Sequence, residues 1–508
     1  MPFPTLSEFA AKSVAQGIVN ETISLDFCLD TKCSNAIVRE LFNEDEVCGQ
    51  NYRKLEEYKN QLSVTKIDFR TYDVDTEAVL NLANFNLVSL DFGEMWFLEM
   101  DFPDPEYGDE FLDIVTMFDR SMNNYSRRSL IHLGMASDQG YIKGWEKEVC
   151  KILPNLQSID ISCHTFDDRF QFPSFCASFP NLRVLDISYV KGLSSLHGIK
   201  KLENLQNLLL CHEDLDNINE YKELSELKTL KHLDVSSNHF SDNWSETGTN
   251  PIRDMLAAGV RMEALEFLDC STTAVTEHEL EEFVKNHSSL QTIAAICTPC
   301  NQSTISGMKM LNMFSMSESL EYLLRTDRNT LVCHFMKDVF ETVKANLTHL
   351  DDFDLCRVKN ALLFVLREPF DRETKVTTLA RYLGSELFQH QLSTSRFPTD
   401  TADIIEMFYN VFNKRDIYTS WQDETVELML GLLEATVNSV SPGLLIPDRV
   451  LHIVFEKTFA LVNQFPQYQT KGNEIVRQAV KWMSSEQIQK MSGNSELERK
   501  VQEMINSA

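Results

Sequence analysis

The chain has 508 residues, of which 43% are hydrophobic and 24% charged, a composition and length that suit roughly two to four globular domains. Its 47 basic and 76 acidic residues give a net charge of −29, which argues against a nucleic-acid surface because phosphate binding needs a basic stripe. No apolar run approaches the ~20 residues that span a membrane and no signal-peptide pattern opens the chain, so we expect an intracellular protein, cytoplasmic or nuclear.

The first predicted element is a helix near the N-terminus. Thr5 and Glu8 have the spacing of a capping box, in which a threonine caps the helix and a glutamate three residues later bonds back to it. Apolar and small residues then follow along one helical face: Leu6, Phe9, Ala10, Ser13, Val14, Gly17 and Ile18. That face must pack either on the chain's own core, as a cap on the fold that follows, or on another protein.

Residues 61–300 repeat a short apolar template. The stretches LPNLQSIDIS, FPNLRVLDIS, LKTLKHLDVS and MEALEFLDCS share the pattern L-x-x-L-x-L, with some variation at its third apolar position. The first apolar residues of the template are Val64, Leu87, Leu130, Leu156, Leu182, Leu205, Leu230, Leu265 and Leu290. Most of their spacings lie within the ~20 to 29 residues of a leucine-rich repeat. We therefore predict about nine strand-and-return units, with helical returns at residues 250–260 and 276–287.

Residues 93–120 enlarge one of these repeats. The stretch contains nine acidic residues and one basic residue, and two prolines interrupt it midway. Its extra length indicates either an elaborated repeat or a protruding loop. The insertion either binds a partner or is mere loop growth, since loops tolerate insertions cheaply.

An aspartate recurs between the last two apolar positions of the template. It is present in six of the nine repeats: Asp68, Asp91, Asp160, Asp186, Asp234 and Asp269. In a strand this position points away from the core, onto the concave face of the stack. The pattern is either a common repeat composition with solvated carboxylates or a surface for a basic ligand. On the second reading we expect Asp160, Asp186, Asp234 and Asp269 to contact a substrate.

Residues 301–508 change to helical spacing, with several apolar faces of 12 or more residues separated by turn signals. The fold class that this predicts is an α/β leucine-rich-repeat solenoid followed by an all-α armadillo/HEAT-like helical domain, although a compact bundle remains open. Trp421 marks the part of this region that we expect to reach a substrate if the concave face does not.

Signatures of catalysis are absent from the sequence. It contains no phosphate-binding glycine loop, no nucleophile elbow and no H-E-x-x-H zinc motif. Cys297 and Cys300 form a C-x-x-C without a second ligand pair nearby, which favours two thiols at the end of the stack over a zinc or redox site. We therefore expect no enzyme activity, no cofactor and no metal.

Residues 5–14, TLSEFAAKSV, match the pattern [STP]-L-x-x-x-[CSA]-x-x-x-[AILV] of the elongin C-binding box. Such a helix, followed by leucine-rich repeats and a helical region, resembles the Zyg-eleven family of cullin-two ubiquitin-ligase substrate receptors over essentially the whole chain. Residues 265–291 look like the family's last repeat with its following helix. The resemblance implies that elongin C, with elongin B, is contacted by Leu6, Phe9, Ala10 and Val14.

The resemblance also implies a cullin-two box downstream, within an N-terminal region at residues 1–60. CSNAIVREL is the best match, with Cys33, Ile37 and Leu41 in its apolar places. It departs from the family pattern at Ser34, where the family has proline. Some members grip an N-terminal glycine with a W-N-L-T-D-E-like stretch, which this sequence lacks, so glycine recognition is not carried over.

The predicted function is the substrate-recognition subunit of a cullin-two elongin B/C ubiquitin ligase, which holds a protein substrate while the bound machinery modifies it. One alternative is an F-box-like adaptor that docks on a Skp-type protein, although no L-P-x-E-[IV]-x-x-x-I-L opening is present. The other is a leucine-rich-repeat scaffold with no ligase role, in which residues 1–60 only cap the stack.

Overall fold

The structure is a computed structural model that divides into two compact units, Met1–Met310 and Leu311–Ala508. We call them unit 1 and unit 2 and describe each by itself. The structure describes residues 6–43, 55–70, 74–92, 95, 98, 100–106, 108–136, 140–166, 170–211, 215, 217–237, 249–345, 352–367, 372–383, 385, 404–405, 422–438, 448–490, 499 and 501.

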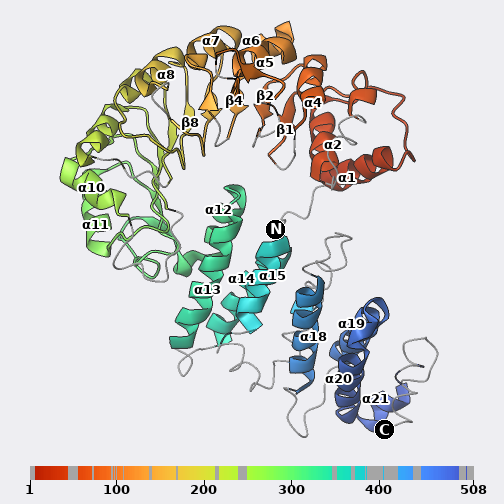
Figure 1. Ribbon diagram of the computed structural model, residues 1–508. Coiled ribbons are helices and arrows are strands. Elements are labelled where there is room, and N and C mark those ends of the chain that lie inside the picture. Colours follow the sequence, from red (N-terminus) through yellow and green to blue (C-terminus); the bar gives the residue numbers. More distant parts are fainter. Residues whose placement is uncertain are drawn as a thin grey trace. The chain divides into compact units, whose positions relative to one another are not determined.

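Unit 1 is built on a curved sheet of ten short strands (Figure 1). The strands stack in chain order, and the pairs from β1 to β12 are parallel. Their bounds are β1 Lys66–Asp68, β2 Ser89–Asp91, β5 His132–Gly134, β7 Ser158–Asp160, β8 Val184–Asp186, β9 Asn207–Leu209, β10 His232–Asp234, β11 Phe267–Asp269, β12 Thr292–Ala294 and β13 Lys309–Leu311.

The predicted template forms the core of this stack. The middle residue of each strand points inward and is almost completely buried, as Ile159, Leu185 and Leu208 illustrate. The chain returns to the next strand along the outer side of the arc, mostly through helices (Figure 1). These are α4 Thr76–Asn81, η1 Leu82–Asn84, α5 Ile114–Ser121, α6 Asn124–Ser129, α7 Trp145–Ile152, α8 Phe172–Ser178, η2 Ile199–Lys201, η3 Ile218–Glu226, α10 Pro251–Ala258 and α11 Glu277–Asn286. The two returns predicted as helical are α10 and α11.

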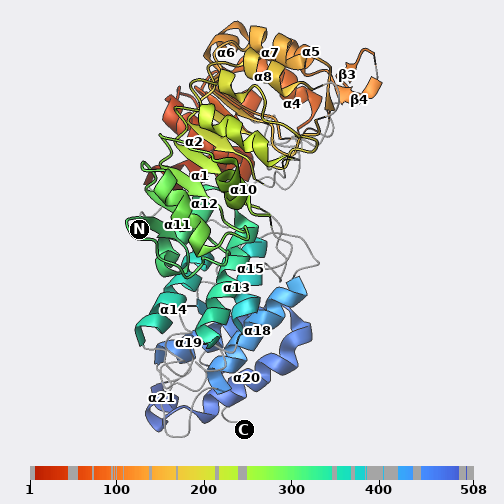
Figure 2. The ribbon, with the colours of Figure 1, turned by 90° about the vertical axis from the view of Figure 1, so that its left-hand side faces the viewer.

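The acidic insertion folds partly into a second, three-stranded sheet. Its strands are β3 Pro103–Asp104, β4 Gly108–Leu112 and β6 Gly140–Tyr141, in the order β3-β4-β6. Figure 2 shows β3 and β4 at one side of the repeats. Asp113 follows β4 directly and caps α5 by accepting from the Thr116 N–H at 2.9 Å. The described part of the insertion is therefore an elaborated repeat that leads into a regular return helix.

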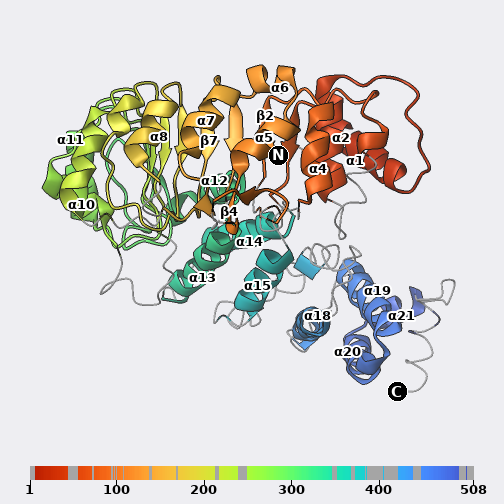
Figure 3. The ribbon, with the colours of Figure 1, turned by 45° about the horizontal axis from the view of Figure 1, so that its top comes forward.

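Unit 2 is helical (Figure 3). Its elements are η4 Met313–Ser315, α12 Met316–Arg325, α13 Asn329–Ala345, α14 Asp352–Arg367, α15 Arg372–Leu383, α18 Gln422–Asn438, α19 Asp448–Gln464, η5 Pro466–Tyr468, α20 Gln469–Lys481 and α21 Ser485–Lys490. Helices two apart in the chain pack together, as α12 does on α14 and α13 on α15. Within the described ranges, no helix has both the length and the apolar content to cross a membrane. The predicted fold class, a leucine-rich-repeat solenoid followed by an all-α helical domain, is confirmed.

Candidate docking surfaces

The N-terminal helix α1, Leu6–Val19, packs against α2, Thr31–Asn43, through one face (Figure 1). That face consists of Ala11, Ala15 and Ile18, which are at most 5% exposed. The sequence prediction had placed Ile18 on the same face as Ala10, and the structure corrects this assignment. Alanines at two successive turns let the two helices approach closely, so α1 is held by its small residues.

The neighbouring face of α1 is left open in unit 1. Ala10 and Ser13 are exposed and Val14 is half-buried at the edge of the core. Leu6 and Phe9, the other predicted elongin contacts, lie in the first turn of α1, but their side chains lie outside the described residues. Thr5, the predicted cap, also lies outside them. Of the two predicted elongin contacts that the structure describes, Ala10 is therefore accessible and Val14 is accessible only in part.

Helix α2 caps the open end of the repeat stack. The Asn35 amide accepts from the backbone N–H groups of Thr65 and Lys66 at 3.0 and 3.2 Å, at the start of β1. Ser34 accepts from the Ser63 N–H at 2.9 Å. These bonds satisfy backbone groups that the first repeat would otherwise leave unpaired. Capping is thus a role of α2, and the open face of α1 is not used for it.

The predicted cullin residues divide between the surface and the core. Cys33 is exposed, whereas Ile37 and Leu41 are 3% and 1% exposed and belong to the core of unit 1. A partner cannot contact these two side chains in this conformation. Cullin binding through this stretch stays a prediction.

The position at which α2 begins explains why Ser34 stands where the family pattern has proline. Asp30 caps α2, since its carboxylate accepts from the Cys33 N–H at 2.8 Å, and this bond lowers the pKa of Asp30. The helix therefore begins at Thr31, and the Ser34 N–H already donates to the Asp30 carbonyl at 2.9 Å. A proline at this fourth helical position would remove that bond and clash with the preceding turn.

The predicted aspartate row runs along the concave face of the sheet. Parallel pairing sets Asp160 beside Asp186 and Asp234 beside Asp269. Leu209 separates the two pairs, because it stands between Asp186 and Asp234 in the register. The row that the sequence predicted is therefore interrupted.

Each of these four carboxylates stabilises the turn that follows its own strand. It accepts a hydrogen bond from the backbone N–H two residues later, as Asp160 does from Ser162 at 2.8 Å and Asp186 from Ser188 at 2.9 Å. Asp234 and Asp269 bond Ser236 and Ser271 in the same way, at 2.9 and 2.8 Å. The repeated L-D-x-S sequence thus closes the turn that ends each strand.

Accessibility differs along the row. Asp160 and Asp186 are half-buried, Asp234 is 8% exposed and Asp269 is fully buried. A ligand on the concave face can reach the first two carboxylates but not Asp269. Burial, together with Asp160 in the adjacent strand, raises the pKa of Asp186 to about 7, and burial also raises the pKa of Asp160. The centre of the row therefore carries less negative charge at neutral pH than its composition suggests.

The sequence analysis did not identify an arginine and a histidine at the N-terminal end of the row. Arg70 lies 2.7 Å from the Asp68 carboxylate and 3.6 Å from that of Asp91, and the His132 imidazole lies 3.7 Å from Asp91. His132 also shares a 2.8 Å hydrogen bond with Ser158 in the next strand. A signal was present, since His132 begins a strand and Arg70 follows a row aspartate by two residues, but only the strand register brings them together.

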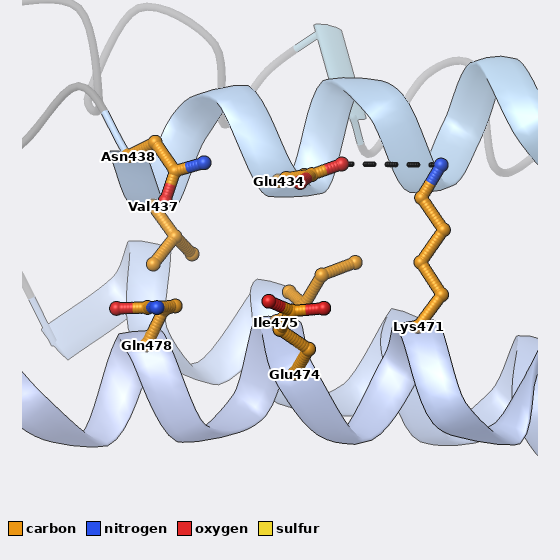
Figure 4. A pocket seen from close by; sticks show the side chains of 7 residues that line it. All are labelled: Glu434, Val437, Asn438, Lys471, Glu474, Ile475 and Gln478. Carbon is orange, nitrogen blue, oxygen red and sulfur yellow. Dashed lines mark ion pairs between the residues drawn. The ribbon is translucent and has the colours of Figure 1, made fainter.

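In the described part of unit 2, a shallow pocket lies between α18 and α20, with about 290 Å³ of solvent-open space (Figure 4). Val437 and Ile475 contribute its apolar part, and Glu434 pairs with Lys471 across it at 3.9 Å. This arrangement is an ordinary polar groove between packed helices. Trp421, the predicted substrate residue of this region, lies outside the described residues.

The two cysteines of the C-x-x-C are buried, at 2% and 0% exposure. Burial raises the pKa of Cys300 to about 11, the opposite of what a reactive thiolate or a metal ligand requires. Among the residues that the structure describes, no three His, Cys, Asp or Glu side chains gather at a distance suited to a metal ion.

Comparison with known proteins identifies the repeats. Residues 173–324 match the family model described as "Zer-1-like, Leucine-rich repeats". The chain is 29% identical over 457 residues to Gastrulation-defective protein 3 of Caenorhabditis elegans, a match that covers 86% of this chain. The chain spans only 62% of the length of that relative.

A solved structure titled "Crystal structure of Rad7 and Elc1 complex in yeast" also matches. It covers 61% of this chain and 94% of its own, at 11% sequence identity and a TM-score of 0.28, a likeness too low to support an inference. The family model and the C. elegans relative carry the assignment instead. The leucine-rich repeats of this chain are Zer-1-like, and these matches confirm the predicted resemblance to the Zyg-eleven family.

Proposed function

We propose that this protein is the substrate-recognition subunit of a cullin-two elongin B/C ubiquitin ligase and that α1 is its docking helix for elongin C. The chain performs no chemistry in this proposal. It raises the local concentration of a bound protein near the ubiquitin-transfer machinery, which is a tethering effect. A site of action inside the cell follows from this role.

One observation carries the proposal: the face of α1 that matches the elongin box is exposed at Ala10, while a different face of the same helix packs on α2. A helix that served only as a cap would turn its most apolar face inward. Here α2 supplies the cap through Ser34 and Asn35. The Zer-1-like repeats add support, because they agree with the family that the box and domain order resemble.

Substrate binding is proposed for the concave face, where Asp160 and Asp186 are accessible. Both carboxylates stand in adjacent strands and can meet a basic segment of a bound protein. Contacts of cullin two with Cys33 and its surroundings, and of a substrate with the region around Trp421, belong to the proposal as well.

The purified full-length chain separates this function from its rivals in a co-elution experiment. We expect it to co-elute with elongin B/C. Co-elution with a Skp-type adaptor would favour the F-box-like alternative, and co-elution with neither would favour a scaffold.

The docking face is tested by Ala10→Glu. We expect this variant to lose elongin B/C while its melting temperature stays within about 2 °C of the parent, because the new charge lies in water in the free protein but would be forced into a close helix contact in the complex. The matched control is Ala177→Glu, which changes an exposed alanine of α8 and should bind normally. Retained binding together with a large loss of stability would instead show that this face serves the fold.

A further inference from the structure

The segment that joins α1 to α2 continues the open face of α1. Helix α1 ends at Val19, and just beyond it Glu21 has a left-handed conformation, at φ 56°. The Thr22 N–H donates to the Gly17 carbonyl at 2.8 Å. This termination turns the chain back along the helix. Ile23 then packs on Gly17 so closely that a Cβ at this glycine would overlap its side chain.

Gly17 lies on the same face of α1 as Ala10 and Ser13, since these positions are seven and four residues before it. The Ile23 side chain, which is 36% exposed, therefore replaces the missing side chain of Gly17 on that face. The open surface of α1 does not end with the helix but passes onto the connecting segment.

Phe27 lies further along the same segment and is 58% exposed. Its neighbours hold the segment on the core. Leu25 is buried in the core, and Leu29 pairs with Leu62 while its N–H donates to the Gln61 carbonyl at 2.7 Å. The segment is thus anchored on both sides of Phe27, while a bend at Phe27 itself leaves the ring exposed. A single exposed apolar residue is common on protein surfaces. Phe27 is not isolated in this sense, because the four residues that follow Ile23 can span at most about 14 Å, so the ring stays near Ile23 and the face of α1 that Ile23 covers.

We propose that the elongin C docking surface extends beyond α1 onto this segment, with Ile23 and Phe27 as its apolar contacts past the end of the helix. This inference rests on the proposed function and deepens it. The occupant is elongin C because the surface is continuous with the face that the elongin box presents, through the contact of Ile23 with Gly17. Aromatic side chains that become buried at such a site commonly contribute most of the binding energy.

The test is a calorimetric titration of the full-length chain with purified elongin B/C. We expect Phe27→Ser to weaken binding at least tenfold with an unchanged melting temperature, because the ring already meets water in the free protein. Ile23→Ser should weaken binding by a smaller factor and lower the melting temperature slightly, because Ile23 also packs on Gly17. The matched control is Tyr125→Ser in α6, which removes an aromatic ring that is 56% exposed elsewhere in unit 1 and should leave affinity unchanged.

The outcomes separate the two proposals. If Ala10→Glu abolishes binding while Phe27→Ser binds within twofold of the parent, the surface ends with α1 and the inference is wrong. If the parent chain does not bind elongin B/C, the proposed function fails. If Phe27→Ser binds elongin B/C normally but no longer recruits cullin two, the segment belongs to the cullin contact and the inference is again wrong.

Amide hydrogen exchange gives an independent check on the parent chain. Residues 22–29 should become protected when elongin B/C is added, and unchanged exchange there contradicts the inference.

Discussion

Asp186 shows how one position in the repeat sets a pH dependence. Burial disfavours its charged form and Asp160 adds repulsion, so its pKa rises from 3.8 to about 7. The folded state then binds this proton more tightly than the unfolded chain does. Its contribution to stability is fully present below about pH 4 and is lost as the pH rises through about 7.

Asp186→Asn should therefore raise the free energy of unfolding at pH 8 by roughly 1–2 kcal/mol. This is less than the roughly 4 kcal/mol that a rise in pKa from 3.8 to about 7 would give in full, because the carboxylate is only half-buried and solvent screens part of the effect. Asparagine keeps the oxygen that accepts the Ser188 N–H. Urea unfolding between pH 4 and pH 8 measures the effect, and the variant's profile should be flatter than the parent's. A variant that is less stable at pH 8 would mean that the charged carboxylate is needed for the turn.

The matched control for this variant is Asp68→Asn at the end of the same row. The pKa of Asp68 is lowered, since burial raises it but the hydrogen bonds and charge of Arg70 outweigh that effect. This carboxylate stabilises the fold at neutral pH and loses its contribution as the pH falls below its unfolded value. We expect Asp68→Asn to change stability in the opposite direction from Asp186→Asn, by a few tenths of a kcal/mol because the pair with Arg70 is exposed.

At the scale of elements, α2 departs from the family pattern for a reason that its geometry makes clear. Helix α2 begins at Thr31 under the Asp30 cap, so position 34 is already past the first turn. Ser34 uses its N–H inside the helix and its hydroxyl to hold Ser63 at the edge of the stack. Ser34 therefore helps to form the first turns of α2 and also pairs a backbone group at the open end of the repeat stack.

Ser34→Pro tests this account of α2. We expect it to lower the free energy of unfolding by about 3 kcal/mol or more, because proline removes the bond to Asp30 and clashes with the preceding turn. Ser34→Ala should cost less, about 1–3 kcal/mol, since it leaves the Ser63 N–H unpaired and removes a long 3.5 Å bond to the Leu29 carbonyl but keeps the helix intact. Chemical denaturation compares the two. If Ser34→Pro is as stable as Ser34→Ala, the helix begins at position 34, as the family pattern implies.

At the scale of the whole molecule, the net charge of −29 suggests attraction to basic partners, but the structure changes where that charge acts. Arg70 and His132 lie beside the first two row carboxylates, and Asp269 is buried. The accessible part of the concave face is therefore centred on Asp160 and Asp186, away from Arg70, although burial raises the pKa of both carboxyls and so reduces their negative charge at neutral pH.

Replacing Asp160, Asp186 and Asp234 together by asparagine should weaken the binding of a lysine-rich peptide and flatten its salt dependence, since attraction between exposed charges is screened over about 8 Å at physiological ionic strength. Titrations at low and high salt measure both effects. Elongin B/C binding serves as the internal control and should not change. Equal peptide affinity in parent and variant would make the row a purely structural feature and direct the search for a substrate site to the region around Trp421.

The sequence by itself determined the repeat architecture, because the L-x-x-L-x-L template is local and each strand buries its own middle residue, as Ile159 and Leu185 do. It also predicted the helical region, whose faces recur at α13, α14, α18, α19 and α20. The elongin and cullin residues came from a motif, and a motif does not specify which side of a helix the rest of the fold covers.

Only the tertiary structure decided accessibility. Helix α1 has small and apolar residues on two adjacent faces, so the choice of Ala11, Ala15 and Ile18 as the buried face depended on the shape of α2. Ile37 and Leu41 match a docking pattern but fill the core, because a helix that caps the stack must bury its apolar side. The aspartates look identical in the sequence, yet stacking places one beside arginine, raises the pKa of another to about 7 and buries a third, since each depends on the neighbouring strands rather than on its own repeat.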